Sequence, residues 1–193
     1  MLPFSQAAEN NKGPILQVLQ EYLTRPGNLL EIGAGTGQHA QWLAPQFPEI
    51  GWTPSEQPEN LQALNQRLGG EPAANLRPAI PLRVQDAWPL GPFEYIFTAN
   101  TFHIMSAEQV ALCIEQACQR LTGQGRFLVY GPFHYQGRPT SDSNRQFDES
   151  LKARDPAMGI RDQEWVVARF AEHRRALLGD HAMPANNRVL VFA

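Results

Sequence analysis

The chain lacks the features that mark membrane, metal-binding and disulfide-bonded proteins. Its only two cysteines, Cys113 and Cys118, are five positions apart on a predicted helix, so they point to different sides and cannot bridge each other. The sequence has no Cys/His cluster with metal-ligand spacing, no apolar stretch as long as a membrane span, and no signal-peptide pattern in its first residues. We therefore expect a cytoplasmic protein that binds neither a metal ion nor a membrane.

Basic residues are scarce as well. Lys12 and Lys152 are the only lysines among the 16 cationic residues, and the formal net charge is −3. Without a basic run, the chain has no electrostatic footprint for nucleic acid. Its 193 residues, 42% of them hydrophobic, are typical of one globular domain. We expect a single domain over residues 1–193 that acts on a small molecule, with monomer and homodimer both open.

Three alternating glycines form the most informative segment. Glu31 ends an apolar run, Gly33, Gly35 and Gly37 follow, and a helical pattern begins at Gln38. Such a loop brings backbone N–H groups close to a ligand that a β-carbon would push away. Dinucleotide-binding loops have the spacing G-x-G-x-x-G, and here Gln38 occupies the third position of that pattern. The spacing E-x-G-x-G-x-G resembles instead the first motif of class I S-adenosylmethionine-dependent methyltransferases, although tight turns also use glycine.

Strands alternate with helices along the chain. Apolar runs predict strands at residues 29–32, 51–56, 82–85, 93–99, 126–130 and 188–192, with a weaker one at 177–183. Helical periodicity predicts helices at 14–23, 38–47, 58–68, 106–121 and 163–178, with a short one at 148–154. Ser106 and Gln109 have the spacing of a capping box at the start of the helix at 106–121. This alternation predicts an α/β fold with a doubly wound sheet. The closing strands resemble those of the seven-stranded, Rossmann-like class I methyltransferase sheet, which is mostly parallel with an antiparallel last strand.

Ligands of an open α/β sheet bind at the carboxyl ends of its strands. We expect Glu31 to engage the ammonium group of S-adenosylmethionine, directly or through water, and the three glycines to pass close to its methionine portion. Glu56, at the end of the second strand, is suited to accept both ribose hydroxyls. The alternative for Glu56 is a solvated loop acid or a helix cap.

Residues after the third predicted strand are suited to adenine. Asp86 can accept from the adenine amino group, the Ala87 backbone N–H can serve a ring nitrogen, and Trp88 can stack on the purine. The alternatives are a solvated loop acid or helix cap for Asp86 and a core aromatic for Trp88.

Longer segments extend the resemblance to a family. They are similar to a group of small methyltransferase-like proteins of bacteria and animals, which includes the human methyltransferase-like protein twenty-six. The similar segments are residues 7–16, 35–40, 52–56, 130–133, 143–148, 154–162 and 183–187. Met-Pro-Ala-Asn-Asn at 183–187 and Glu-x-Asn-Lys at 9–12 are the most specific. The resemblance covers nearly the whole chain. It implies a fold and a cofactor, but it does not identify a substrate.

Candidates for the reaction itself follow the fourth and fifth strands. Asn100 and His103 lie where groups that face the transferred methyl are expected, so they are candidate catalytic residues. Asn100 is also a candidate cofactor ligand, and the alternative for His103 is a hydrogen-bonding residue at a helix start. A general base is needed only if the acceptor loses a proton. Tyr130, His134 and Tyr135 are candidate walls of the acceptor pocket.

Two segments that the general fold does not need, residues 1–13 and 131–162, are candidate lids. In the first, Asn11 and Lys12 are candidate cofactor ligands, and Lys12 is placed to pair with the cofactor carboxylate. In the second, Arg154 and Arg161 either grip an anionic substrate or, as we favour, belong to an ion-pair network in which arginines 145, 154 and 161 alternate with aspartates 148, 155 and 162. Asn186 is a weak substrate candidate that alternatively forms only a turn into the last strand.

These patterns together predict an enzyme, an S-adenosylmethionine-dependent methyltransferase that acts on a small-molecule acceptor. The alternative is a non-catalytic protein that binds S-adenosylmethionine or S-adenosylhomocysteine and acts through a protein partner. An NAD-dependent oxidoreductase is disfavoured by Gln38.

Overall fold

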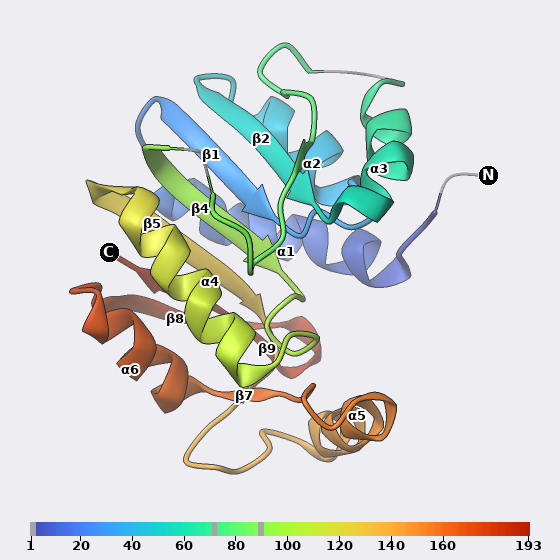
Figure 1. Cartoon of the computed structure of the whole chain (residues 1–193), viewed down its shortest axis with the longest axis vertical. Coiled ribbons are helices and arrows are strands. Elements are labelled where there is room, and N and C mark those ends of the chain that lie inside the picture. The colour runs from blue at the N-terminus through green and yellow to red at the C-terminus, as the bar shows by residue number, and fades with distance from the viewer. Residues whose placement is uncertain (1–2, 71–72, 89–90) are drawn as a thin grey trace.

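The protein is built on one seven-stranded sheet, shown in the computed structural model of Figure 1, which describes residues 3–70, 73–88 and 91–193. The strand order is β3-β2-β1-β4-β5-β9-β8. The strands are β1 (Gly27–Ile32), β2 (Ile50–Glu56), β3 (Ile80–Pro81), β4 (Phe93–Ala99), β5 (Leu121–Gly131), β8 (Leu177–Met183) and β9 (Asn187–Phe192). Only β9 runs antiparallel to its neighbours β5 and β8. The predicted fold class, with its antiparallel last strand, is confirmed.

Helices cover both faces of this sheet (Figure 1). One face packs against α1 (Gln6–Tyr22), α2 (Gln38–Leu43) and α3 (Leu61–Leu68), and the short helices η1 (Ala44–Gln46) and η2 (Pro58–Asn60) adjoin them. The other face packs against α4 (Ala107–Arg120) and α6 (Gln163–Glu172). None of the helices in the described part of the chain is long and apolar enough to span a membrane.

The alternation of β1 shows how the sheet separates two cores. Leu29 packs with the α1 side, whereas Leu30 and Ile32 pack with the α4 side. Successive side chains of a strand point to opposite faces, and β1 is central and parallel, so both sets are buried. On the α4 side the rings of Phe170 and Phe192 stack at a centroid distance of 3.7 Å and tie α6 to β9.

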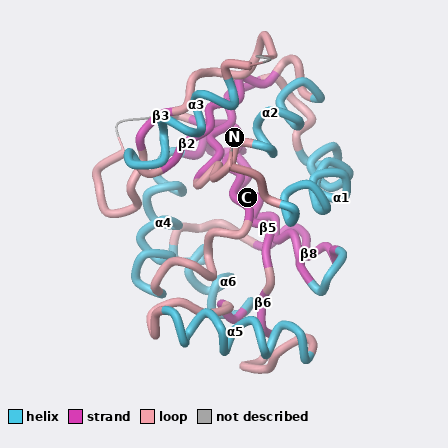
Figure 2. Tube along the Cα trace, turned by 90° about the vertical axis from the view of Figure 1, so that its right-hand side faces the viewer, coloured by secondary structure: helices cyan, strands magenta, loops and turns pink. Residues whose placement is uncertain are grey.

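The segment between β5 and α6 forms a separate layer at one end of the molecule. It holds β6 (Phe133–His134), α5 (Asp142–Arg154) and β7 (Arg161–Asp162), and β6 pairs with β7 in parallel. Figure 2 shows α5 at the opposite end of the molecule from α3. A last short helix, η3 (Pro184–Asn186), joins β8 to β9.

Several predicted boundaries were wrong. The first helix begins at Gln6 and not at Pro14, because the Ser5 side chain caps it by accepting from the Ala8 backbone N–H, and Pro14 lies inside the helix. The third strand covers only Ile80–Pro81, and residues 82–85, predicted as strand, lie beyond its end. The helix predicted at 163–178 ends at Glu172, since β8 starts at Leu177.

Other expectations were confirmed. The weak strand at 177–183 is β8, and the fourth strand has the predicted bounds. Ser106 and Gln109 form the predicted capping box at the start of α4, each side chain binding the backbone N–H of the other. Local sequence signals thus placed the elements that carry their own capping or burial pattern.

Candidate functional site

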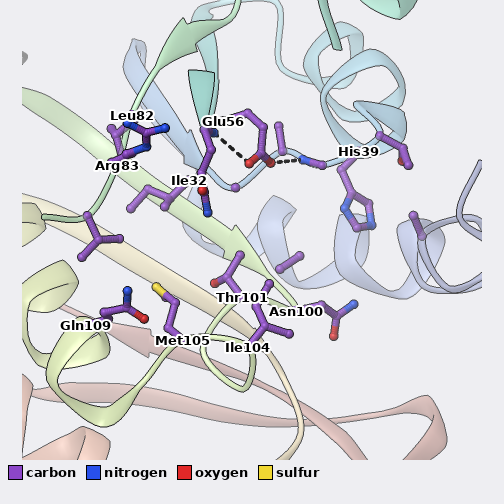
Figure 3. Close-up of a pocket in the computed structure, with 18 of the residues that line it drawn as sticks. Ile32, His39, Glu56, Leu82, Arg83, Asn100, Thr101, Ile104, Met105 and Gln109 are labelled. Carbon is purple, nitrogen blue, oxygen red and sulfur yellow. Dashed lines mark hydrogen bonds between the residues drawn. The ribbon is translucent and has the colours of Figure 1, made fainter. Parts of the chain in front are cut away.

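A cavity of about 590 Å³ lies at the carboxyl ends of β1, β2 and β4 (Figure 3). Its wall is formed by the glycine loop, the end of β2, the segments that follow β3 and β4, and the start of α1. The lining residues are Ser5, Ala8, Ile32, Gly33, Ala34, Gly35, Thr36, His39, Glu56, Gln57, Leu82, Arg83, Val84, Gln85, Ala99, Asn100, Thr101, Ile104, Met105 and Gln109. The cavity therefore lies where ligands of open α/β sheets bind.

The three glycines of the loop have left-handed backbone conformations, with φ of 67°, 55° and 78° at Gly33, Gly35 and Gly37. A β-carbon on Gly33 would lie 2.6 Å from the Thr101 side chain, and one on Gly37 would lie 2.6 Å from Leu64. At Gly35 no atom lies within 4 Å of that position. Gly33 and Gly37 are thus needed for packing, whereas Gly35 exposes its backbone to the open cavity.

Glu56 binds the glycine loop from the end of β2. Its Oε2 accepts from the Gly35 backbone N–H at 2.8 Å, and its Oε1 accepts from the Gln57 backbone N–H at 2.8 Å (Figure 3). The Asn60 amide makes only a long contact of 3.5 Å to Oε1, and a carboxylate has about four acceptor positions, so each oxygen keeps capacity for a further donor. The side chain is fixed beside the cavity with room for two hydroxyl groups.

Glu31 lies beneath the loop instead of in the cavity. It is 2% exposed, and its Oε2 accepts from the Trp52 indole N–H at 2.7 Å. Burial raises the pKa of Glu31 to about 7, with the Glu56 charge acting in the same direction and the Trp52 hydrogen bond opposing it. The carboxylate that we expected at a cofactor ammonium group therefore faces the core.

The residues expected at adenine do not line the cavity. β3 ends at Pro81, so the chain turns away before Asp86 and Ala87, which are exposed. Trp88 is buried in the core on the α4 side, donates its indole N–H to the Arg83 carbonyl at 3.2 Å and stacks beneath the Arg120 guanidinium. This position matches the core-aromatic alternative. The cavity wall at this point is residues 82–85.

Asn100 and His103 follow β4 as predicted. Asn100 lines the cavity in a left-handed conformation, with φ of 59°. His103 is buried with its ring edge-on to Phe147, and burial, followed by the Arg161 charge, lowers its pKa to about 4. A β-carbon on Gly131 would lie 3.9 Å from His103 Nδ1 and 4.0 Å from Asn100 Oδ1. Gly131 thus leaves a small space between these two side chains.

Asn11 and Lys12 point in different directions from α1. Asn11 is buried, and its Oδ1 lies 2.7 Å from His39 Nε2. Lys12 pairs with Glu9 and lies outside the lining of the main cavity, over the Trp42 ring in a second, shallower hollow. The structure therefore brings Asn11 to the site and turns Lys12 away from it.

His39 was missed by the sequence reasoning. It lies two residues after Gly37, in the first turn of α2, is 7% exposed and lines the cavity. The spacing from the glycine loop was the only available signal, because nothing in the sequence shows that α1 covers this turn.

The predicted acceptor residues in the insert mostly serve the insert itself. Arg161 donates to the carbonyls of Met105, Ala157 and Gly159, and Arg154 is exposed. The predicted ion-pair network is wrong in its partners, since Asp148 pairs with Lys152, while Asp155 and Asp162 accept from backbone N–H groups. Arg145 instead pairs with Asp142 and Glu149 on the surface of α5.

The remaining candidates lie around the edges of the insert. Tyr130 is buried beside Asn11, whereas Tyr135 donates its hydroxyl to Asp180 on β8. The Nε2 atom of His134 is buried without a hydrogen-bond partner in the described structure. Asn186 is exposed in η3, and its carbonyl accepts from the Asn144 side chain. None of these four lines the cavity.

Several solved methyltransferases share this fold. Mitomycin 7-O-methyltransferase MmcR has a TM-score of 0.82 at 15% identity, covering 96% of this chain and 53% of that one. The S-adenosylmethionine-dependent methyltransferase SibL has a TM-score of 0.80 at 20% identity, covering 97% of this chain and 55% of that one. Human N-acetylserotonin methyltransferase, in complex with SAM, has a TM-score of 0.80 at 13% identity, covering 97% of this chain and 52% of that one. The likeness defines a class I methyltransferase fold, and the chain spans about half the length of these structures.

One protein family also matches nearly the whole chain. Residues 2–193 match the family described as "Protein of unknown function (DUF938)", and the chain belongs to this family. The predicted resemblance is confirmed as far as the methyltransferase fold. The particular kinship with human methyltransferase-like protein twenty-six stays a prediction.

Replacing Glu31 by glutamine is expected to remove a pH-dependent loss of stability. Folding raises the pKa of Glu31 from 4.5 to about 7, so the native state holds one more proton than the unfolded state between these values. This carboxyl therefore makes the wild type less stable as the pH rises through that window. The free energy of unfolding of E31Q minus that of the wild type should therefore increase by on the order of 3 kcal/mol from pH 5 to pH 8.

Urea unfolding of both proteins at the two pH values measures this difference. His39 and His103, whose pKa values burial lowers to about 4, contribute the opposite slope, but they do so in both proteins and cancel. Glutamine keeps an oxygen for the Trp52 indole, so the contact with β2 is retained. A difference that stays constant with pH would show that Glu31 is charged in the native state.

Proposed function

We propose that this protein is an S-adenosylmethionine-dependent methyltransferase that acts on a small-molecule acceptor. The observation that carries this proposal is the pairing of a left-handed glycine loop with Glu56, which binds the loop backbone and retains free acceptor positions at the cavity. The solved methyltransferases with this fold support it, because two of them carry S-adenosylmethionine or S-adenosylhomocysteine.

The cavity fits each part of this cofactor. Glu56 accepts the two ribose hydroxyls, and the open backbone at Gly35 lies against the methionine portion. The adenine ring packs against apolar side chains from three segments, Ile32, Leu82 and Met105. These residues take the place of Asp86, Ala87 and Trp88, which lie outside the cavity.

When bound, the cofactor supplies an activated methyl group, and the protein contributes mainly position. Methyl transfer from a sulfonium is an in-line displacement, so correct alignment of the acceptor accounts for much of the rate. Asn100 reaches the cavity from the end of β4, and Gly131 leaves space between Asn100 and His103. We assign this space to the acceptor, with the neutral imidazole of His103 at its inner side.

A small acceptor is favoured by the chemistry of the related folds and by the site itself. Two of the proteins with this fold are named for small molecules, mitomycin and N-acetylserotonin. Arg161, a candidate for gripping an anionic substrate, binds three backbone carbonyls instead. Asn100 and His103, which flank the space at Gly131, are uncharged at neutral pH, so they suit an uncharged polar acceptor.

The purified protein is expected to bind S-adenosylhomocysteine, and Glu56→Ala should weaken this binding about ten- to hundredfold. The reason is that losing the hydrogen bonds from the ribose to a charged acceptor costs about 1.5–3 kcal/mol in total. Isothermal titration calorimetry measures the dissociation constants of the wild type and the variant for S-adenosylhomocysteine. The wild type is also titrated with NAD, the ligand of the alternative class of protein.

Glu115→Ala, at an exposed position of α4, serves as the matched control and should bind like the wild type. An unchanged dissociation constant for Glu56→Ala would mean that the ribose is held elsewhere. Heat from NAD but not from S-adenosylhomocysteine would reject the cofactor.

Methyl transfer should depend on the space at Gly131. With isotope-labelled S-adenosylmethionine and a small-molecule cell extract, the wild type should label a product detected by mass spectrometry. Gly131→Ala should reduce this labelling by up to about a hundredfold, because displacing a reacting atom by about an ångström has effects of that size. The added methyl meets its neighbours at 3.9 and 4.0 Å, so the fold and the cofactor affinity should be preserved.

Cofactor binding without any labelled product would favour the alternative, a non-catalytic binder. Equal labelling by Gly131→Ala and wild type would place the acceptor somewhere other than between Asn100 and His103.

We also propose that the start of α1 and the insert close over the bound cofactor. Ser5 and Ala8 already line the cavity, and the Gly159 backbone N–H binds the His103 carbonyl at 3.0 Å. Adding S-adenosylhomocysteine should slow amide hydrogen exchange in residues 5–13 and in at least part of residues 131–162. Protection confined to the glycine loop and the end of β2 would reject this closure.

A further inference from the structure

The imidazole of His39 is a buried polar group with one unused nitrogen. Its Nε2 lies 2.7 Å from Asn11 Oδ1, and its ring contacts Phe97 edge-on. Within the described part of the chain, Nδ1 has no hydrogen-bond partner, and it is not among the buried atoms that are sealed from solvent. Since His39 is 7% exposed and lines the cavity, this nitrogen is available to a ligand there (Figure 3).

The neighbours of His39 determine which ring nitrogen carries the proton. Asn11 Oδ1 lies 2.7 Å from His39 Nε2, and an amide oxygen accepts hydrogen bonds but cannot donate one. The Asn11 oxygen therefore faces His39 and accepts from Nε2–H. Nδ1 is left with a lone pair.

The charge state agrees with this tautomer. Burial lowers the pKa of His39 to about 4, Glu9 raises it and Lys12 lowers it, so the ring is neutral at pH 7. Glu9 and Lys12, both on α1, pair with each other, and Glu56 is the carboxylate that shares the cavity wall. His39 thus offers the cavity a neutral hydrogen-bond acceptor.

The amino-acid end of the proposed cofactor needs such an acceptor. Glu31, expected at the ammonium group, is buried against Trp52, and Lys12, expected at the carboxylate, points away from the cavity. His39 lies on the first turn after the glycine loop, beside the stretch of backbone that we assign to the methionine portion.

We propose, on the basis of the proposed function, that Nδ1 of His39 accepts a hydrogen bond from the ammonium group of S-adenosylmethionine, with Asn11 as a positioning residue. An ammonium group is a donor only, so it is complementary to a lone pair. The cofactor carboxylate is excluded as the partner of this nitrogen, because the carboxylate and the unprotonated Nδ1 are both hydrogen-bond acceptors. The same contact forms with S-adenosylhomocysteine, which has the same amino-acid end.

Ligands that share the thioadenosine part and differ at the amino-acid end test the assignment by calorimetry. 5′-Methylthioadenosine lacks the amino-acid end, and decarboxylated S-adenosylmethionine keeps the amino group without the carboxylate. His39→Gln should weaken S-adenosylhomocysteine and decarboxylated S-adenosylmethionine about ten- to hundredfold, the effect of losing a hydrogen bond to a charged group. The affinity for 5′-methylthioadenosine should change less than about twofold, because this ligand has no ammonium group for His39 to bind.

Matched variants separate this contact from packing. Glutamine places an amide group near the position of Nε2 and keeps a donor for Asn11, whereas asparagine places its oxygen near the position of Nδ1. His39→Asn should therefore retain more S-adenosylhomocysteine affinity than His39→Gln. His173→Gln, at the end of α6 on the opposite face of the sheet, should bind all three ligands like the wild type.

Three results of the binding measurements would overturn the inference. Unchanged S-adenosylhomocysteine affinity in His39→Gln would show that Nδ1 does not contact the cofactor. Equal losses for all three ligands would show that His39 shapes the cavity as a whole. Loss for S-adenosylhomocysteine, with decarboxylated S-adenosylmethionine unaffected, would make the carboxylate its partner. If the wild type binds none of the three, the proposed function itself fails.

Nitrogen-15 spectra of the histidine side chains give a readout that needs no ligand. In the free wild type at pH 7, Nε2 of His39 should carry the proton and Nδ1 should be unprotonated. A proton on Nδ1 would overturn the inference independently of the binding data.

Discussion

The hydrogen bond from the Gly35 backbone N–H to Glu56 Oε2, 2.8 Å long, is the contact on which the site depends. It joins the loop after β1 to the end of β2, and it forms only because the loop passes through left-handed conformations. The carboxylate is thereby held in one orientation at the cavity, with acceptor capacity to spare. The same loop conformation brings Gly33 against Thr101 and so fixes the position of the segment after β4.

The first helix belongs to the site as much as to the fold. The Ser5 backbone N–H donates to Gln38 Oε1 at 2.6 Å, and Gln38 Nε2 donates to Glu9 at 3.2 Å. With the contact between Asn11 and His39, these bonds hold α1 against α2 directly beside the glycine loop. Gln38, which occupies the third glycine position of the dinucleotide spacing, therefore has a structural role here.

The insert supports the site from the other side. Asp148 accepts from the Ile160 backbone N–H at 2.7 Å and so holds the irregular segment before β7 against α5. Arg161 then binds the Met105 carbonyl, and Gly159 binds the His103 carbonyl. The loop after β4 is thus held between the glycine loop and the insert, so both affect the geometry of the space beside Asn100.

The sequence by itself determined the features whose signals are local. The glycine loop, the capping box at Ser106 and the acidic end of β2 depend on residues a few positions apart, and they are where the sequence placed them. Only the tertiary structure decided which side chains reach the cavity. Glu31 is buried because strand alternation turns it toward Trp52, and Trp88 is buried because β3 ends early. His39 reaches the cavity because α1, distant in sequence, covers its turn, and long-range packing of this kind leaves no local pattern.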